Sequence, residues 1–291
     1  MMRMCSRPRA TCRDIIEMMA EAAHFDDGMN AWVLSRYEDV LAALREPTLA
    51  QTGAAGPIDE ATQLRARTEV LEALAGTRAE EWRGRVVSSL RDALDRLPIG
   101  QPVDLATDFL QPWASALTAT EPHAGKSLFT GVSETLPNFL ANALLDLVHN
   151  PDRLADLRGS SDSSSRAVEE LLRHAGLVHM LVRTATADID IGGVRIECGQ
   201  RVVLKLAAAN RDANRFEEPE RLDPNRRANA HVALGAGAHS CAGAVLVRLA
   251  TLAVICEFAA RFTRAELCGP VEWHEGSTLR YPTLLPVIVW R

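Results

Sequence analysis

The feature that most restricts how this chain can fold is a glycine-rich segment around a cysteine, residues 231–250, which reads HVALGAGAHSCAGAVLVRLA. Three glycines surround Cys241, and a long apolar helix is predicted over 242–262. Glycine lets a backbone take positive φ values and approach a flat ligand closely. A cysteine at a helix start lies among unpaired amide donors, which lower the pKa of the thiol and favour metal ligation. The alternative is a buried structural cysteine in a turn rich in small residues.

The rest of the chain predicts a mainly helical protein with a small β region, folded as one domain over residues 1–291. Apolar residues at helical spacing predict helices over 12–23, 37–45, 61–74, 79–97, 105–117 and 166–174, and an apolar helix ending at 149. Alternating segments with glycine turns predict strands at 31–35, 188–191, 194–196, 201–204 and in 278–290. A loop is predicted over 51–60 and irregular structure over 210–230.

Composition excludes several classes of protein. The chain is 47% hydrophobic and 24% charged, as expected of a globular protein with a core. A net charge of −6 argues against a nucleic-acid binder. No apolar run reaches the roughly 18–20 residues of a membrane span, and the basic N-terminal residues lack the apolar stretch of a secretory signal. Six cysteines without a C-x-x-C pair argue against a disulfide framework or a zinc site, so we expect a cytoplasmic protein.

Residues 234–243, LGAGAHSCAG, resemble the cysteine loop of the cytochrome P-450 superfamily, in which a phenylalanine precedes Gly-x-His-x-Cys-x-Gly. The resemblance implies that Cys241 is the axial thiolate ligand of the iron of a haem b and that His239 reaches a haem propionate. Leu234 stands where the family has the phenylalanine that packs beside the thiolate. The glycines that the resemblance places against the cofactor are Gly235, Gly237 and Gly243.

The helix predicted over 166–174 carries Glu170 and Arg173 one turn apart, a spacing at which opposite charges pair. Taken alone, such a pair is usually solvated and contributes little stability. The family places E-x-x-R beneath the haem and completes it with an arginine from a P-E-R-F-like segment, which corresponds here to PERL at 219–222. The resemblance therefore implies a buried structural triad of Glu170, Arg173 and Arg221 with no catalytic role.

Haem carries two propionates, and the resemblance implies that Arg183, within VRTA at 182–185, binds one of them. The H-x-x-x-R helix of the family corresponds to QLRAR at 63–67, so Arg67 is the second propionate ligand and Gln63 takes the histidine position. For Arg67 a solvated helix face remains the alternative.

On the distal side, the family uses an acid and an alcohol on a central helix to relay protons to dioxygen. Glu134 and Thr135, within GVSETLPNFLAN at 131–142, match that pair, while Val132 occupies the position of a usual glycine. Pro137 cannot donate a backbone hydrogen bond, so a helix that passes through it must kink. Alternatively the helix begins at Pro137, and the pair lies on a loop.

Family members are longer, and the sequence indicates where residues are missing. Residues 103–119 resemble the helix before the substrate lid, and only 120–129 separate it from the distal motif, so the lid helices are predicted to be deleted around 118–130. An unroofed haem face would expose an apolar patch that soluble monomers rarely tolerate. We therefore expect a second copy, a partner protein or a carrier-held substrate to cover this face.

The resemblance implies a haem-thiolate oxidoreductase that performs monooxygenase-type oxidation of a small organic substrate in secondary metabolism. Electrons would come from NAD(P)H through ferredoxin and ferredoxin reductase, because the chain has no G-x-G-x-x-G segment. Two alternatives stay open: a peroxide-driven or other non-monooxygenase haem enzyme that catalyses a rearrangement or bond coupling, and a non-catalytic haem-binding accessory protein. The residues expected to line the distal pocket, or else to be ordinary core, are His179, Met180 and Leu181.

Overall fold

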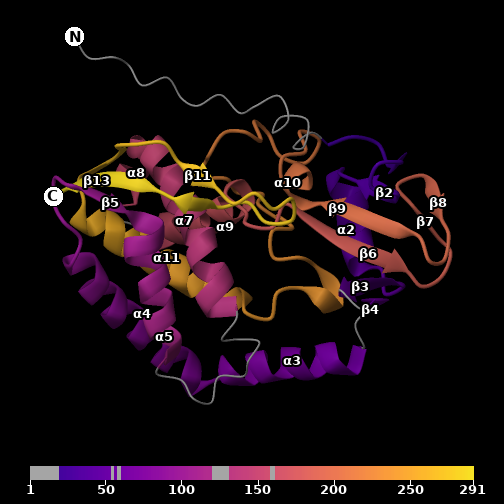
Figure 1. The fold of residues 1–291 in the computed structure, drawn as a ribbon, viewed down its shortest axis with the longest axis horizontal. Coiled ribbons are helices and arrows are strands. Elements are labelled where there is room, and N and C mark those ends of the chain that lie inside the picture. The colour runs from indigo at the N-terminus through magenta and orange to yellow at the C-terminus, as the bar shows by residue number, and fades with distance from the viewer. Residues whose placement is uncertain (1–19, 54–55, 58–59, 120–130, 158–160) are drawn as a thin grey trace, which may run out of the picture.

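The computed structural model describes residues 20–53, 56–57, 60–119, 131–157 and 161–291, with most helices at one end of the molecule and the largest sheet at the other (Figure 1). The α-helices are α2 (Tyr37–Arg45), α3 (Glu60–Ala73), α4 (Thr77–Asp95), α5 (Gln111–Ala119), α7 (Leu136–His149), α8 (Pro151–Asp156), α9 (Ser161–His174), α10 (Leu206–Ala209) and α11 (Ala244–Arg261). Two π-helical turns, η1 (Leu105–Leu110) and η2 (Gly131–Thr135), precede α5 and α7. The prediction of a mainly helical fold with a β region is confirmed.

The largest sheet has the strand order β1-β2-β9-β6-β3-β4. Its strands are β1 (His24–Asp26), β2 (Ala31–Leu34), β3 (Leu49–Gly53), β4 (Gly56–Pro57), β6 (Met180–Ala185) and β9 (Arg201–Lys205). Only β2 and β9 pair in parallel; the other neighbours are antiparallel. The smaller sheets combine β5 (Pro102–Asp104), β10 (Arg264–Leu267) and β13 (Pro286–Trp290), then β11 (Glu272–Trp273) with β12 (Pro282–Leu284), and β7 (Ile189–Ile191) with β8 (Val194–Ile196).

Two segments differ from the sequence-based expectation. The loop predicted over 51–60 instead contains the end of β3 and all of β4, because residues 49–51 find hydrogen-bonding partners on β6, from Leu49 opposite Ala185 to Gln51 opposite Arg183. The helix predicted over 12–23 lies mainly outside the described residues, and residues 20–23 are not helical.

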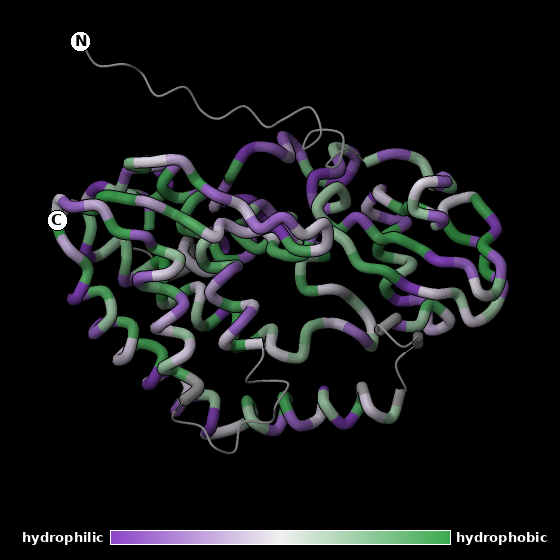
Figure 2. Tube along the Cα trace, in the orientation of Figure 1, coloured by the Kyte–Doolittle hydropathy of each residue, from purple (hydrophilic) through white to green (hydrophobic). Residues whose placement is uncertain are grey.

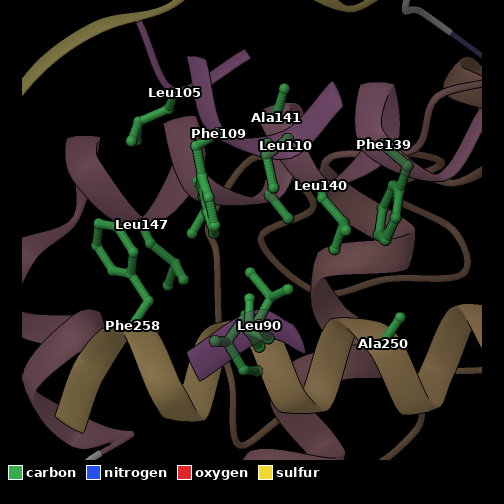
Figure 3. Close-up of a cluster of buried hydrophobic side chains, with 14 of the residues drawn as sticks. Leu90, Leu105, Phe109, Leu110, Phe139, Leu140, Ala141, Leu147, Ala250 and Phe258 are labelled. Atoms are coloured by element: carbon green, nitrogen blue, oxygen red, sulfur yellow. The ribbon is translucent and has the colours of Figure 1, made fainter. Parts of the chain in front are cut away.

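The main core forms where α4, η1, α5, α7 and α11 meet (Figure 3). Leu90, Leu110, Leu140 and Phe258 each have no exposed surface, and burying a side chain of this size contributes about 1.5–3 kcal/mol. In α7, 11 of the 14 residues are buried, so this helix is enclosed on nearly all sides and can hold its first turn rigidly over the site. Figure 2 shows hydrophilic residues alternating with hydrophobic ones along the outer helices α3 and α4.

None of the helices in the described part of the chain combines the length and the apolar character needed to cross a bilayer.

Candidate active site around Cys241

Cys241 lies in a loop between the short 3-10 turn η3 (Gly237–His239) and the start of α11 at Ala244. The backbone N–H of Cys241 donates to the carbonyl oxygen of Leu234 at 2.7 Å, which closes the loop on itself. The loop is therefore held by its own backbone as well as by its neighbours.

Two of the glycines named from the sequence are required by the backbone of this loop. Gly235 and Gly237 have φ values of 70° and 68°, in the left-handed region that favours glycine. A Cβ at Gly237 would lie 3.0 Å from the carbonyl oxygen of Leu44 in α2, so this turn packs closely against that helix. A side chain at either position would shift the loop that carries Cys241.

Burial raises the pKa of the Cys241 thiol, and the hydrogen bond from the Gly243 amide and the charges of Arg248 and Arg67 offset this only in part. The prediction of a lowered pKa is therefore wrong for the free thiol. The reason is geometric: α11 begins only at Ala244, so few of its unpaired amides can reach the sulfur. A bound metal cation would supply the missing positive charge, since a coordinating thiol is deprotonated.

Cys241 lines two adjoining cavities, of about 510 Å³ and about 250 Å³. The larger lies toward α3 and is also bounded by Leu64, Arg67 and Val132. The smaller lies toward β6 and α9. Because they share walls, we treat them as one space between the cysteine loop and the start of α7. The residues common to both are Gln51, Thr135, Leu136, His239, Cys241 and Val247.

The turn that carries the predicted acid–alcohol pair is helical. The π-helical turn η2 leads directly into α7, whose second residue is Pro137, so the proline lies in the first turn of α7, where no N–H is needed. The start of α7 beside Pro137 matches the second alternative, but the acid–alcohol pair lies on the helical turn η2 and not on a loop. Both side chains are exposed, but Thr135 lines both cavities and its Oγ1 donates to the carbonyl of Gly131 at 2.6 Å, whereas Glu134 lines neither cavity.

Arg183 is a buried cation at the edge of the smaller cavity. It is 5% exposed, and burial lowers the pKa of its guanidinium. Its guanidinium donates to the carbonyl of Val182 at 3.1 Å, and no carboxylate among the described residues pairs with it. Burying an unpaired charge is costly, so this arrangement suits an anionic group of a ligand.

Arg67 on α3 contacts the cysteine loop directly. Its guanidinium donates to the carbonyl oxygen of Ser240 and, at 3.3 Å, to the Oγ of the same residue. Arg67 thus joins α3 to the residue before Cys241 and also lines the larger cavity, which does not match the alternative of a solvated helix face. Gln63 is on the same helix, but its side chain lies outside the described part of the structure.

Of the three residues expected in the distal pocket, only Leu181 lines a cavity. Side chains alternate across a strand, so Leu181 and Arg183 on β6 face the cavity while Met180 packs on the opposite face of the sheet, in a cluster with Val33. His179 precedes β6, and its N–H donates to the carbonyl of Thr278 at 2.9 Å. His179 and Met180 line neither of these two cavities, and Met180 fits the alternative of an ordinary core residue.

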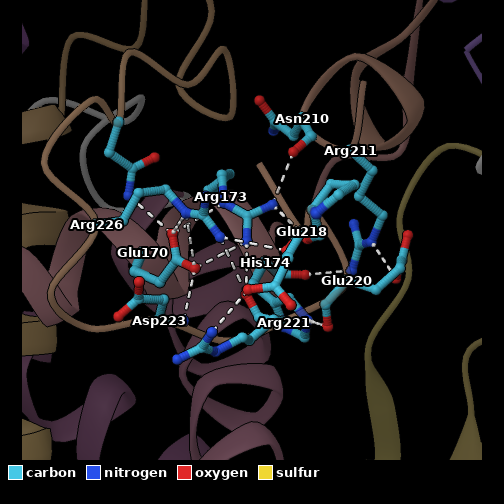
Figure 4. Close-up of polar contacts among 12 residues, drawn as sticks. Glu170, Arg173, His174, Asn210, Arg211, Glu218, Glu220, Arg221, Asp223 and Arg226 are labelled. Atoms are coloured by element: carbon cyan, nitrogen blue, oxygen red, sulfur yellow. Dashed lines mark hydrogen bonds and ion pairs between the residues drawn. The ribbon is translucent and has the colours of Figure 1, made fainter. Parts of the chain in front are cut away.

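The predicted charge cluster beneath the cysteine loop is present, but with a different third member (Figure 4). Glu170 and Arg173 have no exposed surface and form a two-point ion pair at 2.8 and 2.9 Å. The Nε of Arg226 donates to both oxygens of Glu170, at 3.2 and 3.1 Å. Arg221 contributes only its backbone carbonyl, which accepts from Arg173 at 3.2 Å, while its side chain is 53% exposed and pairs with Glu218.

Arg226 therefore replaces Arg221 in the predicted triad. Glu218 has a φ of 44°, and the tight turn that starts there directs the Arg221 side chain outward. Glu170 also accepts from the N–H of Asp223 at 2.8 Å and from the amide of Asn229 at 3.0 Å. One buried carboxylate thus holds residues 223–229, which lead into the cysteine loop.

A second carboxylate, Glu169, joins α9 to α11 and to the first residue of the glycine-rich segment. It accepts from Arg248 at 2.6 and 2.9 Å and contacts the ring of His231 at 3.1 Å. Burial alone would raise the pKa of Glu169, but the bonds from His231 and Arg248 together lower it to about 2. Sequence reasoning missed this residue, although its place next to Glu170 and the position of Arg248 two turns beyond Cys241 were visible.

Comparison with known proteins shows what this architecture resembles. The family model of Cytochrome P450 matches residues 165–266. Nocardicin C N-oxygenase of Nocardia uniformis subsp. tsuyamanensis is 34% identical over 236 residues, which cover 78% of this chain and 56% of the relative. The structure of P450BioI in complex with hexadec-9Z-enoic acid ligated acyl carrier protein superposes with a TM-score of 0.80 at 22% identity, covering 89% of this chain and 92% of that one.

The chain belongs to the cytochrome P450 family. It covers only 39% and 56% of the first two curated relatives that it matches. Its alignment to cytochrome P450 107B1 of Saccharopolyspora erythraea is 27% identical and runs over 363 positions, with 90% of each chain covered. Since 90% of 291 residues is about 262, about 100 positions of that relative have no counterpart in this cytochrome P450.

Cytochromes P450 hold haem, and the residues present fit that group. The joined cavities are of the size that small-ligand sites have, and their shared wall includes both Cys241 and His239. At the edge of the same space, the buried Arg183 lacks a carboxylate partner among the described residues, which suits a propionate. A thiol, a histidine and an unpaired cation around one cavity are the donor set that a haem with two propionates requires.

Proposed function

We propose that this cytochrome P450 is a haem-thiolate oxidoreductase that performs monooxygenase-type oxidation of a small organic substrate, with Cys241 as the axial iron ligand. The observation that carries the proposal is that Cys241 and Thr135 both line the two adjoining cavities, and that the buried Arg183 lines the smaller of them. When bound, haem b supplies the oxidative chemistry, and a thiolate ligand favours cleavage of the O–O bond.

Different residues of the chain would hold different parts of the haem. The Gly243 amide donates to the Cys241 sulfur and tunes its electron density. Arg183 and His239 bind the propionates, while Arg67 fixes the residue before the ligand through its bonds to Ser240. Gly235 and Gly237 allow the backbone to approach the flat face of the cofactor.

Thr135 is the residue best placed to hand protons into the distal side. Its hydroxyl lies at the cavity and now donates to the carbonyl of Gly131 at 2.6 Å, so turning Oγ1 away from that carbonyl frees the proton for a ligand. Glu134 precedes it on the same turn but is exposed, so we assign it the exchange of protons with solvent.

The walls of the space indicate a largely apolar substrate, since Phe139, Leu181 and Leu279 face it. We assign the supply of electrons to NAD(P)H through a ferredoxin and its reductase. The proposed deletion of lid helices around 118–130 falls mostly outside the described residues. The unmatched positions in the alignment to the Saccharopolyspora relative support missing residues in this chain, without giving their place. A second copy, a partner protein or a carrier-held substrate would then cover the distal face, and the complex of P450BioI with an acyl carrier protein supports the last.

Carbon monoxide binding to the reduced protein tests the thiolate ligand. The haem-loaded chain should show the red-shifted Soret band of thiolate ligation, and Cys241→Ser should abolish that band. Cys268→Ser is the matched control, because Cys268 is an exposed cysteine that lines neither cavity. A red-shifted band that persists in Cys241→Ser, or a folded chain that takes up no haem, would overturn the proposal.

One observation favours a second function, the use of peroxide in place of dioxygen and electrons. Glu134 does not line either cavity and Val132 fills the usual glycine position, so the acid–alcohol pair does not converge on the space beside Cys241. Turnover with hydrogen peroxide, and none with reductase and ferredoxin, would favour this alternative. Turnover only with the redox partners would exclude it.

A further inference from the structure

The amide of Asn142 lies at the centre of a hydrogen-bond arrangement that the function above does not use. Asn142 is the only buried polar side chain of α7, and it follows the cavity-lining Phe139 by three residues, on the same side of the helix. It is 7% exposed and does not line either cavity itself. A buried amide in the middle of an apolar helix needs partners, because leaving it unpaired is costly.

The partners of Asn142 belong to two loops that are distant in sequence. Its Nδ2 donates to the carbonyl of Ala175, directly after α9, at 3.2 Å and to the carbonyl of Arg280, just before β12, at 2.7 Å. Its Oδ1 has no donor within the described part of the chain. Both N–H groups of the amide therefore form hydrogen bonds to these two loops.

The two loops are also bonded to each other. The N–H of Arg280 donates to the carbonyl of Leu177 at 3.0 Å, and Val178 forms a bridge with Leu279. The N–H of His179 donates to the carbonyl of Thr278 at 2.9 Å. Asn142 thus anchors a paired unit, residues 175–180 and 278–280, onto the buried central helix.

The side chains of this paired unit form part of the cavity wall. Leu177, Val178 and Leu279 line the smaller cavity together with Phe139 of α7. Gly176 lets the chain pass close to the end of α9, because a Cβ at this position would lie 3.0 Å from the carbonyl oxygen of Leu172. The hydrogen bonds from Asn142 to the carbonyls of Ala175 and Arg280 therefore set the distance between α7 and this wall. The residues next to those two carbonyls line the cavity.

We propose that Asn142 is a positioning residue for substrate selection: its amide fixes the wall formed by 175–180 and 278–280 relative to Phe139, and so limits the width of the group that fits above the haem. The inference rests on the proposed function, because it takes the haem to occupy the joined cavities, with Arg183 at a propionate, and the wall with Phe139 to bound the part of the smaller cavity that is left for the substrate. It assigns no chemical step to Asn142.

The test uses two iron-binding probes of different width on the haem-loaded full chain, imidazole and 4-phenylimidazole. Asn142→Leu keeps the size of the side chain but removes both donors. In this variant the wall is no longer held in register with Phe139 and should contact the phenyl ring less closely, so the dissociation constant of 4-phenylimidazole, measured from the Soret shift, should rise about fivefold, equivalent to about 1 kcal/mol. The dissociation constant of imidazole should stay within about twofold of the unaltered value, because its ring is too small to contact the wall.

Two further variants separate positioning from general loss of stability. Asn150→Leu removes an amide that donates to Asp146 at the other end of α7, and it should leave the ratio of the two dissociation constants unchanged. Asn142→Gln keeps an amide donor and should restore the ratio toward that of the unaltered chain. An unchanged ratio in folded, haem-loaded Asn142→Leu would overturn the inference.

Hydrogen exchange provides a readout that does not require haem. The amides of Arg280 and His179 should exchange faster in Asn142→Leu than in the unaltered chain, and equal rates would also overturn the inference. If Asn142→Leu does not fold, the deciding measurement is made on the haem-loaded unaltered chain: 4-phenylimidazole should slow exchange at both amides, and unchanged exchange would overturn the inference. A lack of any Soret shift with imidazole in the unaltered chain would instead overturn the proposed function, and this inference with it.

Discussion

The buried carboxylate of Glu170 allows a direct test of which arginine completes the cluster beneath the cysteine loop. Sequence resemblance selects Arg221, whereas the structure selects Arg226, whose side chain is 9% exposed and donates to both oxygens of Glu170. The variants to compare are Arg226→Met and Arg221→Met, since methionine keeps an unbranched apolar chain and removes the charge.

The expected loss follows from what remains after each substitution. Without Arg226, Glu170 keeps its two bonds from Arg173, so the cost is below the about 3–5 kcal/mol of leaving a buried charge unpaired. Loss of one hydrogen-bonded charged partner costs about 2–3 kcal/mol. For a chain of this size that corresponds to a melting temperature lower by about 4–12 °C. Arg221 is exposed and its surface pair with Glu218 contributes little stability, so Arg221→Met should leave the melting temperature almost unchanged.

Thermal unfolding followed by circular dichroism, on samples with equal haem content, measures both effects. Arg173→Met serves as the upper reference, because it removes the two-point pair and leaves the carbonyls of Asn210 and Pro219 without their donor. We expect the order of destabilisation Arg173→Met, then Arg226→Met, then Arg221→Met. A melting temperature lowered as much by Arg221→Met as by Arg226→Met would refute the assignment.

Three other predictions concern the site. The pKa of Glu169 is about 2, against 4.5 for an ordinary glutamate. The stability that its ionised form contributes is therefore present above about pH 4.5 and is lost as the pH falls toward 2. The difference in urea midpoint between the unaltered chain and Glu169→Gln should shrink from about pH 6 to about pH 3, and a constant difference would contradict this. Arg183→Met should speed haem transfer to an acceptor globin about tenfold, while Arg201→Met, at an exposed residue of the same sheet, should not. Thr135→Ala should keep haem bound but divert reducing equivalents from product, and Glu134→Gln should have a smaller effect; equal product yields from Thr135→Ala and the unaltered chain would remove the hydroxyl from the mechanism.

The spacing of apolar residues predicted the elements whose structure depends mainly on their own sequence. The helix over 37–45 matches α2 at both ends, because its apolar positions recur at helical spacing and Glu46-Pro47 stops it. The strand β3 has no such signal, since Leu49–Gly53 becomes a strand only by pairing with β6. A segment whose structure depends on a distant partner cannot be predicted from its own residues.

The site shows the same division between local and distant causes. The place of Cys241 at a cavity and the pairing of Glu170 with Arg173 follow from motifs with fixed spacing, so both could be predicted from the sequence, while the role of Cys241 as a ligand stays a prediction. Arg226 could not be predicted, because its place in the cluster depends on a turn at Glu218 that reverses the neighbouring side chains. Met180 is a different case: the two-residue alternation of a strand already separates it from Leu181, and this signal was available in the sequence.

Every contact of Glu170 described above joins groups of the chain itself, from α9 to Asn229. One carboxylate on α9 therefore ties residues 223–229 to that helix, so a substitution at Glu170 would loosen the whole segment before the cysteine loop at once.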